Sequence, residues 1–269
     1  MKKMMTAIAA FTLVAGTAAC TPAGTEEAAE AAQGAGLAGT WKANVDSAES
    51  KNNISNLVLA DGQYTCNSCI PPYSTAANGE WQDVDRPGVD QIMFEIVDEN
   101  TVKSATRFEG EDLGTSTWTV SEDGQTMKQE FVNLRGDEST KGDLTLARVG
   151  PAPDGSHAIS GEWDLAEYGD ISDSALMTTY AIDGDSITVT YNTGGFTATL
   201  GGEAVAMDGD NSGTLVAAEK TGDNIYRETY TRDGETVSVV ETTVDGNTLS
   251  IVSKDPRDNS EFRYTATRQ

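Results

Sequence analysis

The residues that could carry chemistry begin with the cysteines, of which Cys66 and Cys69 form the only closely spaced pair. Two thiols at this spacing form a short disulfide, act as a redox couple, or supply two of the four ligands of a zinc site. Pro71 and Pro72 follow at once, and prolines oppose the helix whose N-terminus would activate a redox thiol. His157 is the only histidine, so a zinc site would lack ligands. We therefore expect a structural disulfide, with no metal and no other cofactor.

A second candidate is the segment from Asp208 to Glu219, which follows the spacing of a calcium-binding loop. Asp208, Asp210 and Ser212 stand at its first, third and fifth positions, a glycine at the sixth, and Glu219 at the twelfth. A loop of this kind needs flanking helices, and neither flank has a helical pattern. An acidic hairpin loop is the simpler interpretation, and a calcium-stabilised surface protein is kept as an alternative.

His157, with Asp154 and Ser156 beside it, is the remaining catalytic candidate. These residue types form a catalytic triad in many hydrolases, but no Gly-x-Ser-x-Gly turn supports one here. A carboxylate pair for glycoside hydrolysis cannot be singled out among 43 Asp and Glu residues without geometry. We therefore assign no catalytic residues and expect a protein that is not an enzyme.

The first residues of the chain predict export. Lys2 and Lys3 precede a short apolar stretch, and small residues then lead to Cys20. The stretch is shorter than the roughly 20 apolar residues that span a bilayer, so residues 1–19 are predicted to be a signal peptide. Cleavage here yields either a soluble protein or, because a cysteine follows the junction, a protein anchored through Cys20.

Thr17-Ala18-Ala19-Cys20 resembles the lipobox of bacterial lipoproteins. The resemblance implies that Cys20 is lipidated and holds the protein on a lipid bilayer. Thr21, which is not aspartate, implies by the same resemblance the outer membrane, with the protein facing the periplasm. Residues 20–36 lack large apolar side chains, so the chain after Cys20 is predicted to be a flexible linker rich in alanine and glutamate.

The formal net charge is −25, from 18 Lys and Arg against 43 Asp and Glu. Such a chain repels the phosphates of nucleic acids and of anionic lipids. Nucleic acid is therefore excluded as a partner, and the membrane would be reached through the anchor alone. Hydrophobic residues make up 38% of the chain, which is enough for a packed core.

Beyond the linker, the chain consists of two copies of one unit. Gly39-Thr40-Trp41 recurs 122 residues later as Gly161-Glu162-Trp163, and two Asp-Gly pairs recur at the same spacing. A fixed spacing of separate landmarks indicates an internal repeat. It divides the chain into a unit at residues 37–149, a linker at residues 150–157 and a second unit at residues 158–269.

Both units have the pattern of short strands. Ile187 and Val189 alternate with polar residues in the second unit, as Ile92 and Phe94 do in the first. Asp-Gly and other glycine turns separate these runs at short intervals, which is typical of hairpins. No segment after residue 37 has a helical period. The sequence thus predicts an all-β fold of two tandem antiparallel up-and-down β-barrels, of about nine strands each, or sandwiches of the same strands.

Gly39-x-Trp41 and Gly161-x-Trp163, each at the first strand of its unit, resemble the Gly-x-Trp signature of lipocalin-like (calycin) barrels. The resemblance implies that an arginine near the last strand of each unit lies over the tryptophan and closes one barrel end. Arg148 and Arg268 stand at these places, which pairs Arg148 with Trp41 and Arg268 with Trp163. It also implies that the protein binds a small or apolar ligand in the periplasm.

The alternative is a protein-binding module. Small barrels beginning with Gly-x-Trp are similar to exported metalloprotease inhibitors, which implies that residues 21–36 could enter a protease cleft. The short spacing of Cys66 and Cys69 differs from the wider disulfide of that family. The sequence names neither the ligand nor the protein partner.

Overall fold

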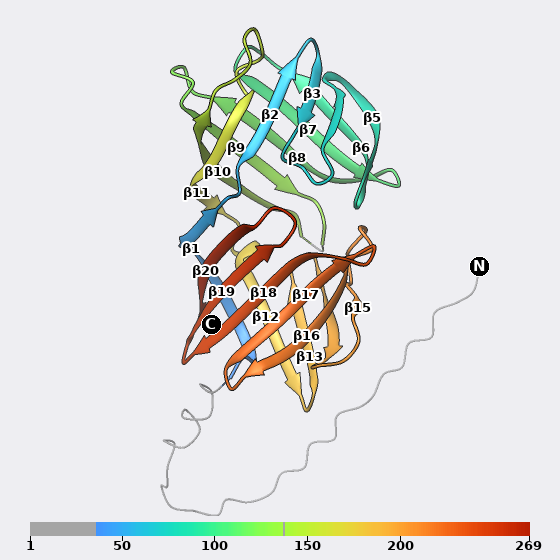
Figure 1. Cartoon of the computed structure of the whole chain (residues 1–269), viewed down its shortest axis with the longest axis vertical. Helices are drawn as coiled ribbons and strands as arrows, with labels where there is room; N and C mark the ends of the chain where they lie inside the picture. The colour runs from blue at the N-terminus through green and yellow to red at the C-terminus, as the bar shows by residue number, and fades with distance from the viewer. Residues whose placement is uncertain (1–35, 137) are drawn as a thin grey trace, which may run out of the picture. The chain divides into compact units, whose positions relative to one another are not determined.

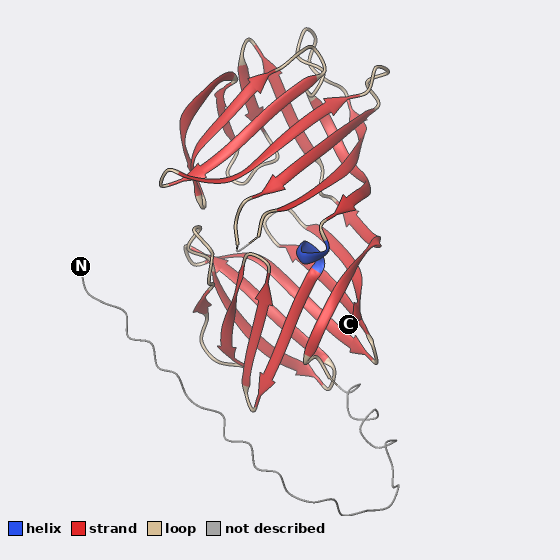
Figure 2. Ribbon diagram, turned by 180° about the vertical axis from the view of Figure 1, so that it is seen from behind, coloured by secondary structure: helices blue, strands red, loops and turns tan. Residues whose placement is uncertain are grey.

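The computed structural model describes residues 36–136 and 138–269. The predicted signal peptide, the lipid attachment at Cys20 and nearly all of the predicted linker lie outside the described residues. The described part is built of twenty strands and one 3-10 turn, η2 (Asp173–Leu176), as Figure 2 shows. The prediction of an all-β fold is therefore confirmed.

Ten consecutive strands form one antiparallel sheet, which we call the first barrel. Its order is β4-β3-β2-β11-β10-β9-β8-β7-β6-β5. The edge strands β4 and β5 are separated by Ala77 alone, so the sheet curls back on itself and is nearly closed. The strands are β2 (Ser55–Ala60), β3 (Gln63–Cys66), β4 (Tyr73–Ala76), β5 (Asn78–Arg86), β6 (Val89–Ile96), β7 (Thr101–Phe108), β8 (Glu111–Val120), β9 (Thr126–Asn133), β10 (Thr140–Gly150) and β11 (Gly161–Ile171).

The other ten strands form the second barrel, in the order β14-β13-β12-β1-β20-β19-β18-β17-β16-β15. It is also nearly closed, because Gly195 of β14 bridges to Asp208, just beyond β15. The strands are β1 (Gly39–Lys51), β12 (Met177–Asp183), β13 (Ser186–Tyr191), β14 (Gly194–Thr199), β15 (Val205–Ala206), β16 (Leu215–Gly222), β17 (Ile225–Arg232), β18 (Glu235–Asp245), β19 (Thr248–Asp255) and β20 (Ser260–Arg268).

The two barrels differ from the predicted units in one respect. The first strand of each unit pairs with strands of the other unit. The strand β1 opens the first repeat but pairs with β12 and β20 of the second barrel, where Figure 1 shows it in blue beside the red β20. The strand β11 opens the second repeat but pairs with β10 and β2 of the first barrel. The two repeats have therefore exchanged their first strands.

The short connection after β1 explains the exchange. In the first barrel, Trp163 of β11 pairs with Ser55 at the start of β2. If β1 took the place of β11, Trp41 would lie beside Ser55, and Lys51 would lie about 33 Å further along the strand. Residues 52–54 span about 14 Å at most, so they could not bring the chain back to Ser55. The chain instead continues from β1 into the other barrel.

Each barrel has its own core, formed by alternate side chains along the strands. Ile92 and Phe94 lie in the core of the first barrel, and Ile187 and Val189 lie in the core of the second. All four side chains are buried, so the alternation in the sequence identified the inward faces of these strands correctly.

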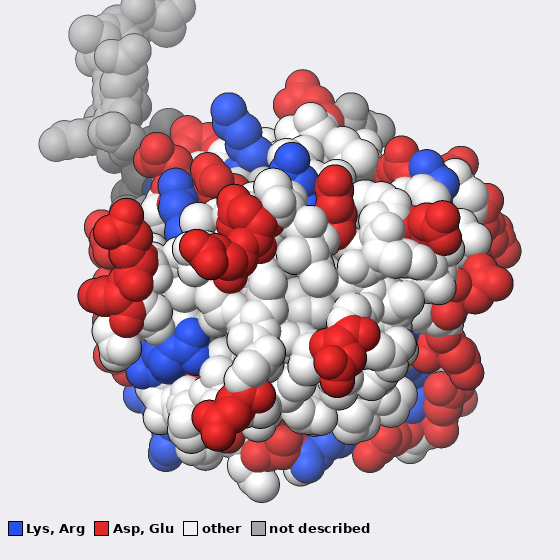
Figure 3. Space-filling model, turned by 90° about the horizontal axis from the view of Figure 1, so that it is seen from above, with Lys and Arg blue, Asp and Glu red and all other residues white. Residues whose placement is uncertain are grey.

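The outer surface carries most of the charge. Figure 3 shows acidic side chains spread over one face of the molecule, with fewer lysines and arginines among them. Several cations are paired, as Arg227 is with Glu219 and Glu241. The uncompensated negative charge favours the approach of cations over anions.

Candidate functional site

One end of each barrel is closed by its tryptophan. Trp41 is 1% exposed and Trp163 is 0% exposed. The Trp41 indole N–H donates a hydrogen bond to the carbonyl of Leu37 at 2.8 Å, and that of Trp163 donates to Ile159 at 2.9 Å. Leu37 and Ile159 are themselves 122 residues apart. The two tryptophans therefore occupy equivalent environments, as the repeat predicts.

An arginine lies over each tryptophan, but the partners differ from those expected. The Arg148 guanidinium lies 4.1 Å from the ring centroid of Trp163, and that of Arg268 lies 4.1 Å from the centroid of Trp41. The prediction that Arg148 pairs with Trp41 and Arg268 with Trp163 was therefore wrong. The exchange of β1 and β11 carries each tryptophan into the other barrel, where the arginine of that barrel meets it.

The glycine of each Gly-x-Trp motif makes room for the arginine. Gly39 and Gly161 have φ angles of 133° and 129°, and a Cβ atom on either would collide with the guanidinium of Arg268 or Arg148. The freed space lets Arg268 Nη1 donate to the carbonyl of Ala38 at 2.6 Å. These six residues (Gly39, Trp41, Arg148, Gly161, Trp163 and Arg268) thus close the barrel ends, and any ligand must enter elsewhere.

The other end of the first barrel holds a pocket of about 680 Å³. Drug-sized ligands occupy pockets of about 300–1,000 Å³ that are mostly apolar with a few polar groups. Its apolar wall combines interior side chains from five strands, and its rim carries the amides of Asn52, Asn53 and Asn67. The wall residues are Leu57 of β2, Tyr64 of β3, Trp118 of β8, Met127 of β9 and Leu146 of β10.

Two aromatic residues of this wall, Tyr64 and Trp118, stack with the buried ring of Phe94. The centroids of Tyr64 and Phe94 are 3.9 Å apart at an interplanar angle of 22°, and those of Phe94 and Trp118 are 5.7 Å apart at 15°. Burial raises the pKa of the Tyr64 hydroxyl far above its ordinary value, so this group stays neutral. The part of the wall that the strands form is therefore uncharged, and two of its residues are aromatic.

The disulfide lies at the rim of this pocket. Cys66 and Cys69 are bonded, which agrees with the predicted disulfide, and both line the pocket. The bond closes the turn after β3, so it holds that part of the rim in place. On the next two strands, the guanidinium of Arg86 in β5 lies 4.1 Å from the ring centroid of Tyr73 in β4. The structure thus confirms the predicted bond between the two cysteines.

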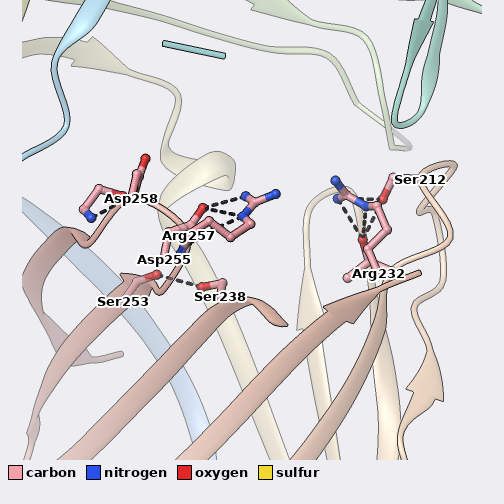
Figure 4. Close-up of polar contacts among 9 residues, drawn as sticks. Ser212, Arg232, Ser238, Ser253, Asp255, Arg257 and Asp258 are labelled. Carbon is pink, nitrogen blue, oxygen red and sulfur yellow. Dashed lines mark hydrogen bonds and ion pairs between the residues drawn. The ribbon is translucent and has the colours of Figure 1, made fainter. Parts of the chain in front are cut away.

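Arg257 and Asp258, from the turn between β19 and β20, complete the lining. Arg257 is already paired: its Nε donates to Asp255 Oδ1 at 2.9 Å, and its Nη2 donates to Asp255 Oδ2 at 2.5 Å (Figure 4). The hydrogen bond from the Arg257 side chain holds the pKa of Asp255 below its ordinary value. The pocket therefore offers no unpaired cation among its lining residues.

The second barrel has a different interior. Glu228 of β17 is only 5% exposed, although it is an acid. The Tyr230 hydroxyl donates to Glu228 Oε2 at 2.5 Å and lies 3.3 Å from the Tyr191 hydroxyl. Burial raises the pKa of Glu228, and the hydrogen bond from Tyr230 opposes that rise. Glu228 alternates with Tyr226 and Tyr230, and this spacing could have placed it on an inward face. The sequence analysis did not identify it.

We expect Glu228→Gln to stabilise the protein increasingly as the pH rises. Below the ordinary glutamate pKa of about 4.3, the carboxyl is protonated in both the folded and the unfolded chain. Above it, the unfolded chain loses the proton first, and Glu228 lowers the free energy of unfolding by about 1.4 kcal/mol per pH unit until the folded state also ionises. Glutamine keeps the shape without the titration. Urea unfolding of both proteins between pH 4 and pH 8 measures the difference, and a constant difference would contradict the expected burial of charge.

The structure separates the residues of the predicted calcium-binding pattern. The Asp210 carboxylate accepts hydrogen bonds from the backbone N–H groups of Ser212 and Thr214, at 3.1 and 2.9 Å, while Glu219 lies on β16 and pairs with Arg227. Over residues 36–136 and 138–269, no three His, Cys, Asp or Glu side chains lie close enough together to hold a metal ion. The structure therefore does not assemble the calcium pattern of the sequence.

Both ring nitrogens of His157 contact backbone atoms. Its Nε2 lies 2.7 Å from the carbonyl oxygen of Asp98, and its Nδ1 lies 3.3 Å from the backbone nitrogen of Ile159. Ser156 bonds to the carbonyl of Pro153 instead of to the histidine. The hydrogen bonds of Ser156 and His157 are thus not those of a catalytic triad.

Comparison of the chain with protein-family models, with curated proteins and with solved structures finds no match. Within the described ranges, no helix has the length and apolar character needed to cross a bilayer.

Proposed function

We propose that the protein binds a small, largely apolar and uncharged ligand at the open end of the first barrel. The observation that carries this proposal is the pocket of about 680 Å³ lined by interior side chains of that barrel. Its size and apolar wall fit ligand sites in general. The lipocalin-like resemblance of the Gly-x-Trp motifs supports the same function, because a ligand inside the barrel is the usual role of that family.

The chemistry of the wall and rim favours an uncharged ligand. Trp118 and Tyr64 offer ring faces for stacking, and the amides of Asn53 and Gln129 offer hydrogen bonds. Arg257 is neutralised by Asp255, and the chain carries a net charge of −25, which disfavours anions. A ligand with an apolar ring and one or two polar groups suits this arrangement.

The neutral fluorescent probe N-phenyl-1-naphthylamine tests the proposal. We expect one saturable site per chain, and we expect Trp118→Ala to weaken binding by about tenfold or more, since stacking on an aromatic ring is lost. Thr242→Ala is the matched control, because Thr242 holds the corresponding position in the second barrel. Probe uptake that appears only in urea, or equal affinity for Trp118→Ala and the unaltered protein, would contradict the proposal.

We further propose that this binding takes place on the periplasmic side of the outer membrane, where lipidated Cys20 anchors the protein. The signal-peptide pattern and the lipobox resemblance support this location. The protease-inhibitor alternative depends on residues 21–36, of which the structure describes Gly36 alone. No observation on the described residues favours that alternative over ligand binding.

A further inference from the structure

The interior of the second barrel contains a buried acid surrounded by tyrosines. Glu228 and Tyr180 are buried, whereas Tyr191, Tyr230 and Tyr264 are partly exposed. The four tyrosines come from β12, β13, β17 and β20, so they reach Glu228 from different sides of the barrel. Proximity to Glu228 raises the pKa of each of these hydroxyls in addition to the larger effect of burial. Glu228 is thus more deeply buried than three of the four tyrosines around it.

Glu228 has no cationic partner in the described part of the chain. None of the ion pairs there, with nitrogen and oxygen within 4.0 Å, includes Glu228. Arg232, on the same strand as Glu228, donates hydrogen bonds to Ser212 and Thr214, and Arg257 is paired with Asp255 (Figure 4). A buried carboxylate without a counter-charge is costly, so the site favours a ligand that supplies one.

The position that Glu228 occupies in the second barrel is occupied by Ser104 in the first. Val102 of β7 pairs with Trp118, as Tyr226 of β17 pairs with Thr242, so Ser104 and Glu228 occupy equivalent inward positions. By the same registers, the three stacked rings of the first barrel are replaced by smaller or non-aromatic side chains. These replacements are Ile187 for Tyr64, Ala218 for Phe94 and Thr242 for Trp118.

The second barrel therefore has a carboxylate where the first has a hydroxyl, and Ala218 is the cross-strand neighbour of Glu228. Tyrosine ring faces attract organic cations, and tyrosine hydroxyls accept hydrogen bonds from ammonium groups. The net charge of −25 on the chain raises the local concentration of cations around the protein. The carboxylate, the tyrosines and the negative charge of the protein all favour an organic cation as the ligand.

We propose that the second barrel binds a compact organic cation, a primary amine with an aromatic or apolar group, at Glu228 and its three partly exposed tyrosines. Its ammonium group pairs with Glu228, and its apolar part packs among Tyr191, Tyr230 and Tyr264. Arg232 and Arg257 do not compete for the carboxylate because they bond to Ser212, Thr214 and Asp255. This site is separate from the pocket of the first barrel and does not depend on a ligand there.

Phenethylamine and phenethyl alcohol form a matched pair of probes for the full-length protein, because they differ in charge at similar size. Calorimetric titration at neutral pH in about 0.15 M salt screens the surface charges. We expect saturable binding of phenethylamine at one site, about tenfold or more tighter than phenethyl alcohol. Glu228→Gln should remove this preference, and its circular dichroism should match that of the unaltered protein.

Ser104→Ala is the matched control in the first barrel and should leave phenethylamine binding unchanged. Equal affinities for the two probes, equal binding of phenethylamine by Glu228→Gln, or loss of binding in Ser104→Ala would each overturn the proposal. Absence of saturable phenethylamine binding would overturn it as well. None of these results bears on N-phenyl-1-naphthylamine binding at Trp118, so failure of the two sites can be told apart.

Discussion

Replacing Trp163 with alanine is expected to lower the free energy of unfolding of the first barrel by about 3–5 kcal/mol. The indole is 0% exposed, bonds to Ile159 and lies under Arg148, so alanine leaves a cavity at the closed end and an arginine without its ring. Hydrogen exchange followed by mass spectrometry measures the loss, because it resolves the amides of the first barrel from those of the second.

Double-mutant cycles with Arg148→Ala supply the control for this prediction. Arg148 and Trp163 should show a coupling energy of about 1 kcal/mol, since the guanidinium lies over the ring. Arg148 and Trp41 should show none, because Trp41 belongs to the other barrel. Coupling of Arg148 to Trp41 would mean that the first strands are not exchanged. Trp81→Ala, at a half-buried position outside the core clusters, should cost much less than Trp163→Ala.

Much of the fold follows from local patterns in the sequence. The alternation at Ile187 and Val189 identifies an inward face because strand side chains alternate with a period of two. The spacing of 122 residues between Trp41 and Trp163 correctly predicted equivalent environments. Arg148 and Arg268 were identified through the resemblance of the Gly-x-Trp motifs to lipocalin-like barrels, although each was paired with the other tryptophan. These features depend on residues close together in one strand or one repeat.

The exchange of β1 and β11 was not predicted because the two repeats carry the same motif. Both strands begin with Gly-x-Trp, so this motif alone is compatible with either pairing. What decides between them is the length of the connection at residues 52–54 relative to that of β1. That comparison needs the register of Trp163 with Ser55, which appears only in the structure.

The candidate sites were harder to predict than the fold. Trp118 belongs to no sequence motif, and its stacking with Phe94 and Tyr64 depends on three strands meeting in one barrel. Glu228 was hidden among 43 acids, and its burial distinguishes it from the others. The disulfide was the exception, because Cys66 and Cys69 are close in the sequence and no distant partner was needed.

The two barrels share one strand plan and differ in their interiors. Where the first has Trp118, Phe94 and an open pocket, the second has Glu228 and partly exposed tyrosines. An uncharged ligand in one barrel and an amine in the other are the proposals that this difference supports. Both depend on which strands build each barrel.

Two fragments of equal length test that assignment most directly. Residues 52–172 contain all ten strands of the first barrel and the tryptophan that closes it, whereas residues 37–157 follow the repeat and lack β11. We expect amide NMR spectra of residues 52–172 to be well dispersed and its urea unfolding to be cooperative, and we expect neither for residues 37–157 as a monomer. A cooperative, well-dispersed fragment 37–157 beside an unfolded fragment 52–172 would contradict the exchange.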